Sequence, residues 1–216
     1  RHGQCLAAQA LETLTHNSLT CVRVHQRTKG QIQHMALLEN LMPCPTALQT
    51  IRDEHASLAA MLQSMRLMVQ RGPQDDRRQF FDVLRAMLFY IDEFPERLHH
   101  PKESNLLFPK LVKRAPEVMG AIDRLERDHI RSEKAARDLL HLLIAWELLG
   151  NTRRADFVAA LGPYVASYLE HMRLEETVVL PAAERALRDE DWTALDQAFE
   201  QNADPLTGKH MPEPVY

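Results

Sequence analysis

The chain repeats one pattern of residues in its two halves, and this repeat constrains the fold more than any other feature. Residues 51–55 (IRDEH) align with residues 125–129 (LERDH) at an offset of 74 residues. Residues 99–103 (HHPKE) align with residues 171–175 (HMRLE) at an offset of 72, and in both cases a proline follows the histidine by ten residues. If each half forms one helical hairpin, the two similar hairpins predict an all-α fold, an antiparallel four-helix bundle.

Apolar residues recur every three or four positions, which is typical of helices with one buried face. We expect a first helix from Thr46 to the Gly72-Pro73 stop, and a second from about Asp76 to Leu111, kinked or divided at Pro95 and Pro101. The third begins at Pro116 and ends before Gly150. The fourth follows to about Leu187 with an interruption at Gly162-Pro163, and a short fifth helix spans about 191–200.

These helices suggest three parts in the chain. Residues 1–45 form an N-terminal extension that is partly helical or disordered, residues 46–187 form the bundle, and residues 188–216 form a short helix and a tail. The three cysteines, Cys5, Cys21 and Cys44, are too widely spaced for a disulfide framework or a zinc site, which indicates a reducing compartment. We therefore expect a cytoplasmic protein.

The composition excludes two classes of partner. A formal net charge of −4 and an isoelectric point near 6.3 provide no basic surface for nucleic acid. No apolar run approaches the roughly 18 residues that a membrane span requires. We expect no nucleic-acid and no membrane partner, and a homodimer is the assembly that we consider.

Four histidines occupy unusual positions in the helical pattern. His99 and Glu103, and likewise His171 and Glu175, are four residues apart and so share one helix face. His55 and His129 stand where the periodicity calls for Leu or Ile. One such histidine is most often a hydrogen-bonded core residue, and one HxxxE pair is usually a surface pair. Because all four helices show the feature, we predict a shared metal site instead.

The types of ligand narrow the choice of metal. Imidazole and carboxylate without thiolate suit iron, with zinc or manganese as alternative occupants, and glutamates on facing helices can bridge two ions. Glu103, Glu133 and Glu175 would offset most of the positive charge of two ferrous ions. We assign no catalytic residue.

At these residues the sequence resembles the hemerythrin family, in particular its HHE cation-binding branch. The resemblance covers about residues 46–187 and implies two non-haem iron ions with bridging carboxylates and an open position for dioxygen or peroxide. It places His55 and His99 on one iron, and His129 and His171 on the other. Glu103 and Glu175 would bridge the two ions.

Two positions depart from the oxygen-carrying members. They have a histidine one turn after the third-helix histidine, where this chain has Glu133, and we keep Glu133 as a ligand. Their HxxxxD motif in the fourth helix would select Glu176, whereas the internal repeat selects Glu175, which we prefer. His100 is expected at the rim of the site, or as an extra ligand if the helix distorts there.

Several functions fit this pattern. The first is binding of iron with dioxygen or peroxide, for handling or for redox sensing. An alternative is an enzyme that turns over peroxide, oxygen or nitric oxide, with weak catalase-like activity, because a carboxylate at Glu133 would favour ferric iron. A second alternative is a ferritin-like carboxylate protein, because Glu96-x-x-His99 and Glu126-x-x-His129 match its ExxH motif.

Overall fold

A computed structural model describes residues 46–207, and this part of the chain is helical without a strand. The long helices are α3 (Thr46–Arg71), α4 (Arg77–Ile91), α7 (Met119–Leu149), α8 (Arg154–Leu174) and α10 (Asp189–Glu200), with short helices α5 (His100–Lys102), α6 (Phe108–Arg114) and α9 (Leu180–Ala186). Three π-helical segments are η2 (Asp92–His99), η3 (Glu103–Leu107) and η6 (Glu175–Val179), and 3₁₀ turns span Pro116–Val118, Asn151–Arg153 and Pro205–Thr207. The expected N-terminal extension and the end of the tail lie outside the described residues.

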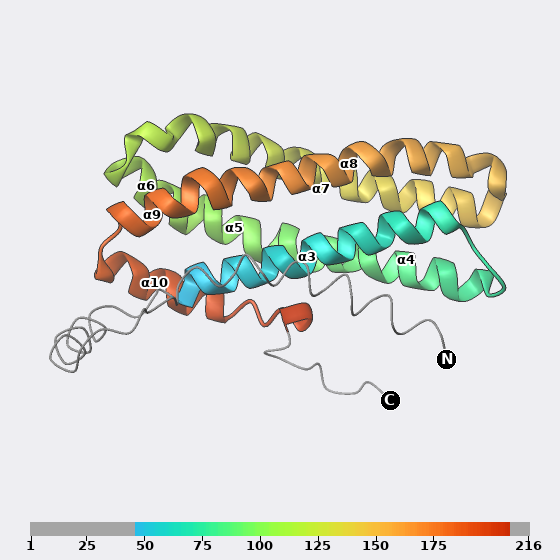
Figure 1. Ribbon diagram of the computed structural model, residues 1–216, viewed down its shortest axis with the longest axis horizontal. Coiled ribbons are helices and arrows are strands. Elements are labelled where there is room, and N and C mark those ends of the chain that lie inside the picture. The colour runs from blue at the N-terminus through green and yellow to red at the C-terminus, as the bar shows by residue number, and fades with distance from the viewer. Residues whose placement is uncertain (1–45, 208–216) are drawn as a thin grey trace, which may run out of the picture. The chain divides into compact units, whose positions relative to one another are not determined.

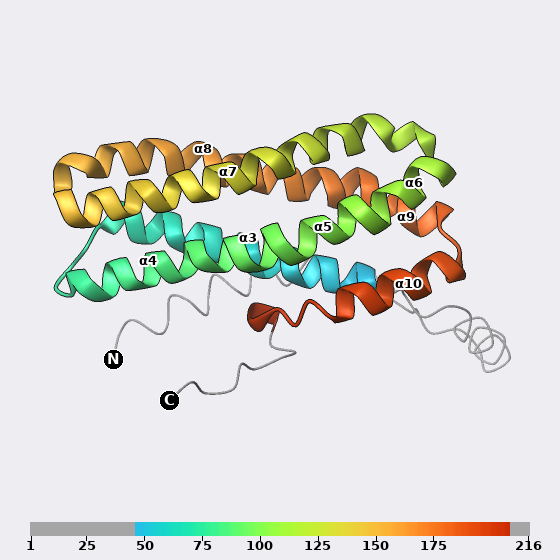
Figure 2. The same ribbon diagram turned by 180° about the vertical axis from the view of Figure 1, so that it is seen from behind.

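The long helices pack into a bundle, which confirms the all-helical class. α7 packs on α8, α8 on α3, α3 on α4, and α4 on α7, while α10 packs against α3. Figures 1 and 2 show these helices side by side from two opposite directions. None of the helices between residues 46 and 207 is long and apolar enough to cross a membrane.

Local signals in the sequence account for the helix ends. The carboxylate of Asp76 accepts a hydrogen bond of 2.8 Å from the backbone N–H of Gln79, so it caps the start of α4. Gly72 and Gly150 follow α3 and α7 with φ angles of 74° and 86°, a region that glycine enters without steric cost.

The second helix is irregular around Pro95 and Pro101, as expected, because it alternates between α-helical and π-helical segments there. Around Pro95 the second helix changes to π-helical winding, in which the backbone N–H of His100 bonds to the carbonyl of Pro95, five residues earlier. His99 and His100, where this segment ends, are both buried. The predicted interruption at Gly162-Pro163 is wrong, because α8 runs through both residues. Both residues are exposed, so water can bind the backbone carbonyl that lacks an N–H partner because Pro163 has none.

Two apolar clusters fill the interior, and buried polar residues lie between them along the helices. One cluster contains Leu62, Phe81 and Trp146. The other contains Leu48 and Phe108 and includes residues of α10. On α3, His55 lies between Ile51 of the second cluster and Leu58 of the first. The same order holds on α7, where His129 separates Leu125 from Ala136, so the fold presents its buried histidines at one level.

Candidate metal centre

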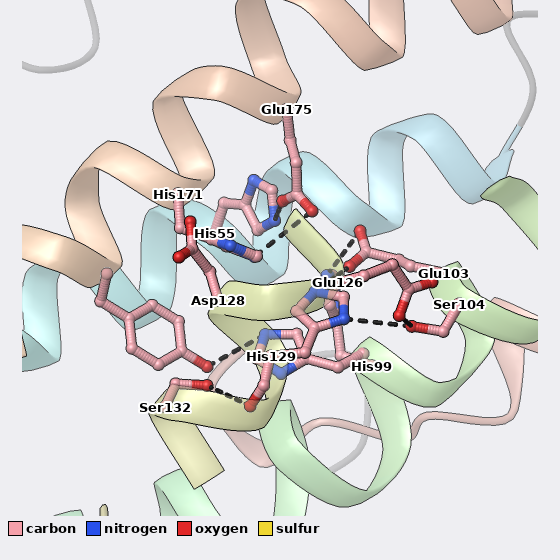
Figure 3. Close-up of polar contacts among 12 residues, drawn as sticks. His55, His99, Glu103, Ser104, Glu126, Asp128, His129, Ser132, His171 and Glu175 are labelled. Carbon is pink, nitrogen blue, oxygen red and sulfur yellow. Dashed lines mark hydrogen bonds and ion pairs between the residues drawn. The ribbon is translucent and has the colours of Figure 1, made fainter. Parts of the chain in front are cut away.

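Six of the seven side chains that we predicted as ligands converge at this level (Figure 3). They form two overlapping groups whose nitrogen and oxygen atoms lie within 4.8 Å of one another: His55, His99, Glu103 and Glu175; and Glu103, His129, His171 and Glu175. All six residues are buried. They come from α3, η2, η3, α7, α8 and η6. The site therefore depends on how all of these helical segments wind and pack together.

The two carboxylates lie between the histidines. Glu103 is 0% exposed, with Oε1 3.1 Å from His99 Nε2 and Oε2 3.4 Å from His129 Nε2. Glu175 is also 0% exposed, with Oε1 3.3 Å from His171 Nε2 and Oε2 3.1 Å from His55 Nε2. Each carboxylate therefore has one oxygen beside a histidine of the first half of the chain and one beside a histidine of the second half.

Several of these atoms lack a hydrogen-bond partner within the described part of the chain. They are Glu103 Oε2, His129 Nε2, both ring nitrogens of His171 and both carboxylate oxygens of Glu175. The contacts of 3.1 to 3.4 Å between these histidines and glutamates are ion pairs whose angles do not meet the geometry of a hydrogen bond. Buried polar atoms are normally paired, so this concentration of unpaired nitrogens and oxygens fits a bound cation. The donor set of four imidazoles and two carboxylates suits iron, zinc or manganese.

The histidines and glutamates of the cluster shift one another's pKa values, and a bound cation would change their protonation. Burial alone lowers the pKa of His55, but the adjacent Glu175 and Glu176 outweigh it and raise that pKa to about 9. Burial raises the pKa of Glu175, but His171 and His55 outweigh it and hold that pKa well below its ordinary value. Without a cation, protons on histidines thus balance the ionised carboxylates. A metal ion would displace those protons.

A carboxylate that the sequence analysis did not select fixes the orientation of His99. Glu54 Oε2 accepts a 2.6 Å hydrogen bond from Nδ1 of His99, which leaves Nε2 directed toward Glu103. The side-chain amide of Asn202, after α10, donates bonds of 2.9 and 3.0 Å to the two oxygens of Glu54. In the sequence, the position of Glu54 next to His55 is a weak indication that it lies near the site. Asn202 lies in a segment without periodicity, so the sequence gives no indication of its role.

The Nδ1 atoms of His129 and His55 also lie beside side-chain oxygens. His129 Nδ1 lies 3.1 Å from Ser104 Oγ, whose hydroxyl donates to Glu126, and His55 Nδ1 lies 3.1 Å from Glu176 Oε1. The side chain of Glu176 is 45% exposed, so it flanks His55 from the surface. The structure thus brings Glu175 and not Glu176 into the cluster, as the internal repeat indicated.

His100 is buried beside the six residues, and its imidazole stacks on that of His129 with ring centroids 4.0 Å apart. Its Nδ1 lies 3.0 Å from Glu96 Oε2, and its Nε2 lies 3.2 Å from the hydroxyl of Tyr168. Burial, followed by the charges of His129 and His171, holds the pKa of His100 well below its usual value. His100 therefore carries no proton beyond the neutral form, and it forms a third group with His129 and His171 whose ring nitrogens lie within 4.8 Å of one another. The helix distortion under which we considered it as an extra ligand is present.

The structure does not place Glu133 among the converging residues. Its side chain is 50% exposed and its Oε1 lies 3.0 Å from Arg137. On α7 the buried face continues from His129 to Ala136, and the imidazole of His100 stacks on that of His129. Our argument that Glu133 favours ferric iron therefore loses its basis.

The ExxH motifs of the ferritin-like alternative are not assembled either. Glu96 contacts His100, Ser132 and Tyr168, and Glu126 accepts a hydrogen bond from Ser104. Neither carboxylate belongs to the groups of residues that converge on His99 or His129.

Comparison with known families gives one result that spans most of the described chain. Residues 46–183 match the family described as Hemerythrin HHE cation binding domain. A search of curated proteins gives no match.

Proposed function

The chain belongs to the hemerythrin HHE cation-binding family, and on that premise we propose that it holds two non-haem iron ions. His55 and His99 bind one ion, and His129 and His171 bind the other. Glu103 and Glu175 bridge the two. The helices that carry these residues would form the antiparallel four-helix bundle of two hairpins that the internal repeat predicts.

One observation supports this assignment above all others. Glu103 and Glu175 are fully buried, and each has one oxygen near His55 or His99 and the other near His129 or His171. Two carboxylates in this position are suited to bridging a pair of cations. If only one cation were bound, the inward ring nitrogens of one histidine pair would have no cation to bind.

The charges in the layer agree with a dinuclear centre. Two divalent ions bring four positive charges, and Glu54, Glu103 and Glu175 supply three buried negative charges when they are ionised. Isolated buried charges are costly by several kcal/mol each, so ions and carboxylates stabilise one another only when both are present. Removal of the metal should therefore destabilise the fold.

The physiological role that we propose is binding of dioxygen or peroxide. Bound iron would supply the one-electron chemistry that such molecules require. The residues of this chain orient the imidazoles through Glu54 and Ser104, and two apolar clusters shield the layer from water. Turnover of peroxide, as in a catalase-like enzyme, and a cytoplasmic location remain predictions of the sequence.

Metal stoichiometry tests the proposal directly. Protein purified without an affinity tag is incubated with excess ferrous ion under anaerobic conditions and desalted, and iron per chain is measured by elemental analysis. We expect about two ions per chain and an increase in the melting temperature over the metal-free protein. One tightly held ion, or retention of zinc with no affinity for iron, would contradict the dinuclear iron assignment.

A further inference from the structure

The ligand atoms of the metal centre are closed off from solvent, so a metal ion can enter or leave only if part of the chain moves. Glu103 and Glu175 are 0% exposed, and the ring nitrogens of His171 are buried as well. Two apolar clusters pack the helices on the two sides of this layer. Separating those helices would expose apolar surface, which is unfavourable. A segment that hydrogen bonds hold in place can move more easily.

Such a segment follows α10. Residues 201–207, which we name the C-terminal strap, end in the 3₁₀ turn Pro205–Thr207, which packs against α3 (Figure 1). Within the strap, Asn202 is 4% exposed and Asp204 is 5% exposed, whereas Ala203 between them is exposed. The strap therefore attaches to the bundle through two buried polar side chains.

Hydrogen bonds fasten these two side chains to three helices. The side-chain amide of Asn202 donates to both oxygens of Glu54 on α3, and its amide oxygen accepts a hydrogen bond from the ammonium group of Lys102 on α5. The hydroxyl of Tyr90 on α4 donates a hydrogen bond of 2.7 Å to Asp204. Breaking these bonds would free the strap without separating the helices.

Residues of the strap line two cavities. The outer cavity, of about 430 Å³, lies between α3 and the end of α10, and the exposed residue Glu200 is part of its lining. The inner cavity, of about 20 Å³, is lined by three histidines of the cluster, His55, His99 and His171. Glu54 and Asp204 line both cavities. These two carboxylates therefore form part of the wall that separates the outer cavity from the histidines.

The backbone of the strap is strained at Ala203, which has a φ angle of 47°. This left-handed conformation is unfavourable for a residue with a Cβ atom, and it persists only where the surrounding contacts hold it. Here the buried side chains of Asn202 and Asp204 hold the backbone on both sides. Opening the strap would release this strain, so the closed position is less stable than its hydrogen bonds alone would make it.

We infer that the C-terminal strap is a gate through which the metal centre exchanges metal ions with solvent. In the closed position, the hydrogen bonds of the strap block the route past Glu54. When they break, the outer cavity joins the inner one and a divalent cation can reach His99. The carboxylates of Glu54, Glu200 and Asp204 along this route attract a cation. The inference rests on the proposed function, because it requires a metal ion to be held behind the strap.

Measuring the loading and the release of ferrous ion separately distinguishes a gate from a support for the ligands. Metal-free protein is mixed with ferrous ion under anaerobic conditions, and samples are quenched with an excess of a coloured chelator that reacts at once with free ion only. Loaded protein mixed with the same chelator gives the release rate. A gate changes both rates by the same factor and leaves the affinity unchanged, whereas a lost support speeds release alone.

Two variants should shift both rates in opposite directions. Tyr90→Phe removes one hydrogen bond to a charged acceptor, so both rates should rise by about tenfold. Ala203→Gly relieves the backbone strain at an exposed position, so both rates should fall by about threefold. Because this second variant changes no buried side chain, the test does not depend on the folding of Tyr90→Phe.

Asp196→Ala is the matched control. It removes a hydrogen bond of 2.7 Å from the backbone N–H of Ala47 on α3 to the side chain of Asp196 on α10, which lies outside the strap. Both rates in this variant should stay within twofold of those of the unmodified protein.

The outcomes separate the two proposals. If the unmodified protein retains no ferrous ion, the proposed function fails and the inference fails with it. If iron is retained but both rates stay within twofold of the unmodified protein in Tyr90→Phe and in Ala203→Gly, only the inference is overturned. Faster release in Tyr90→Phe without a matching rise in loading would also overturn it, because the strap would then support the ligands without admitting the metal.

Discussion

Replacement of Glu175 and of its neighbour Glu176 by alanine tests the geometry of the metal centre most sharply. The two residues are adjacent and chemically identical, and both contact His55. Glu175 is 0% exposed and also contacts His171, whereas the Glu176 side chain is 45% exposed. We expect Glu175→Ala to lose the metal and Glu176→Ala to retain it.

The magnitude follows from the contacts. Changing a residue that only supports a metal ligand lowers affinity by about 10–100-fold, so a residue that bridges both ions should matter by more than 100-fold. Glu176 supports one histidine from the surface, and its loss should stay near the lower bound, about tenfold. In the metal-free protein, Glu175→Ala also removes the buried counter-charge of His55 and His171, which should lower the free energy of unfolding by ~3–5 kcal/mol.

Two measurements check these values. Iron affinity is obtained by competition with a chelator of known affinity, and the free energy of unfolding of the metal-free forms is obtained by urea denaturation at pH 7. Glu175→Gln, which keeps the shape without the charge, separates charge from packing. If Glu176→Ala empties the site while Glu175→Ala remains loaded, the register taken from the internal repeat is wrong.

Three further changes have defined outcomes. Asn202→Ala should lower iron affinity by about 10-fold, because Glu54 loses both hydrogen bonds from the Asn202 amide and then holds His99 less firmly. The same chelator competition measures this, and an unchanged affinity would show that Asn202 does not support the site. Glu133→Ala should leave iron content and autoxidation rate unchanged, because the side chain is exposed, and any loss of iron would restore it as a ligand. Iron affinity should fall by about tenfold per pH unit below pH 9 for each displaced proton, because the pKa of His55 is raised from 6.5 to about 9, and calorimetry in two buffers should detect proton release. The stabilisation that protonated His55 gives the metal-free protein is complete below pH 6.5 and should disappear as the pH rises through about 9, which thermal unfolding would show.

The positions of the six clustered residues could be predicted because their signals are local. A spacing of four residues puts His99 beside Glu103 and His171 beside Glu175 on any helix. Likewise, a polar ring at a position of apolar periodicity, as at His55, is visible without knowledge of its neighbours. The family match confirms the resemblance that these spacings suggested.

Regular periodicity failed where the helix itself is irregular. The π-helical segment at Pro95 shifts the register of the residues that follow it, and both His99 and His100 are buried. His100 stacks on His129, whereas the side chain of Glu133 is 50% exposed and lies beside Arg137. Proline marked the irregularity in the sequence, but the change to π-helical winding is seen only in the structure.

The helical class and the histidine and glutamate spacings can be predicted from the sequence because each depends on residues within about one helical turn of another. The internal repeat is visible when the two halves of the chain are aligned. Which partners hold those side chains depends on the tertiary structure. The hydrogen bonds of Asn202 and Glu54 join residues 148 positions apart, and the stacking of His100 on His129 joins residues of two different helices. Contacts of this kind depend on the packing of distant segments, and a helical period carries no information about them.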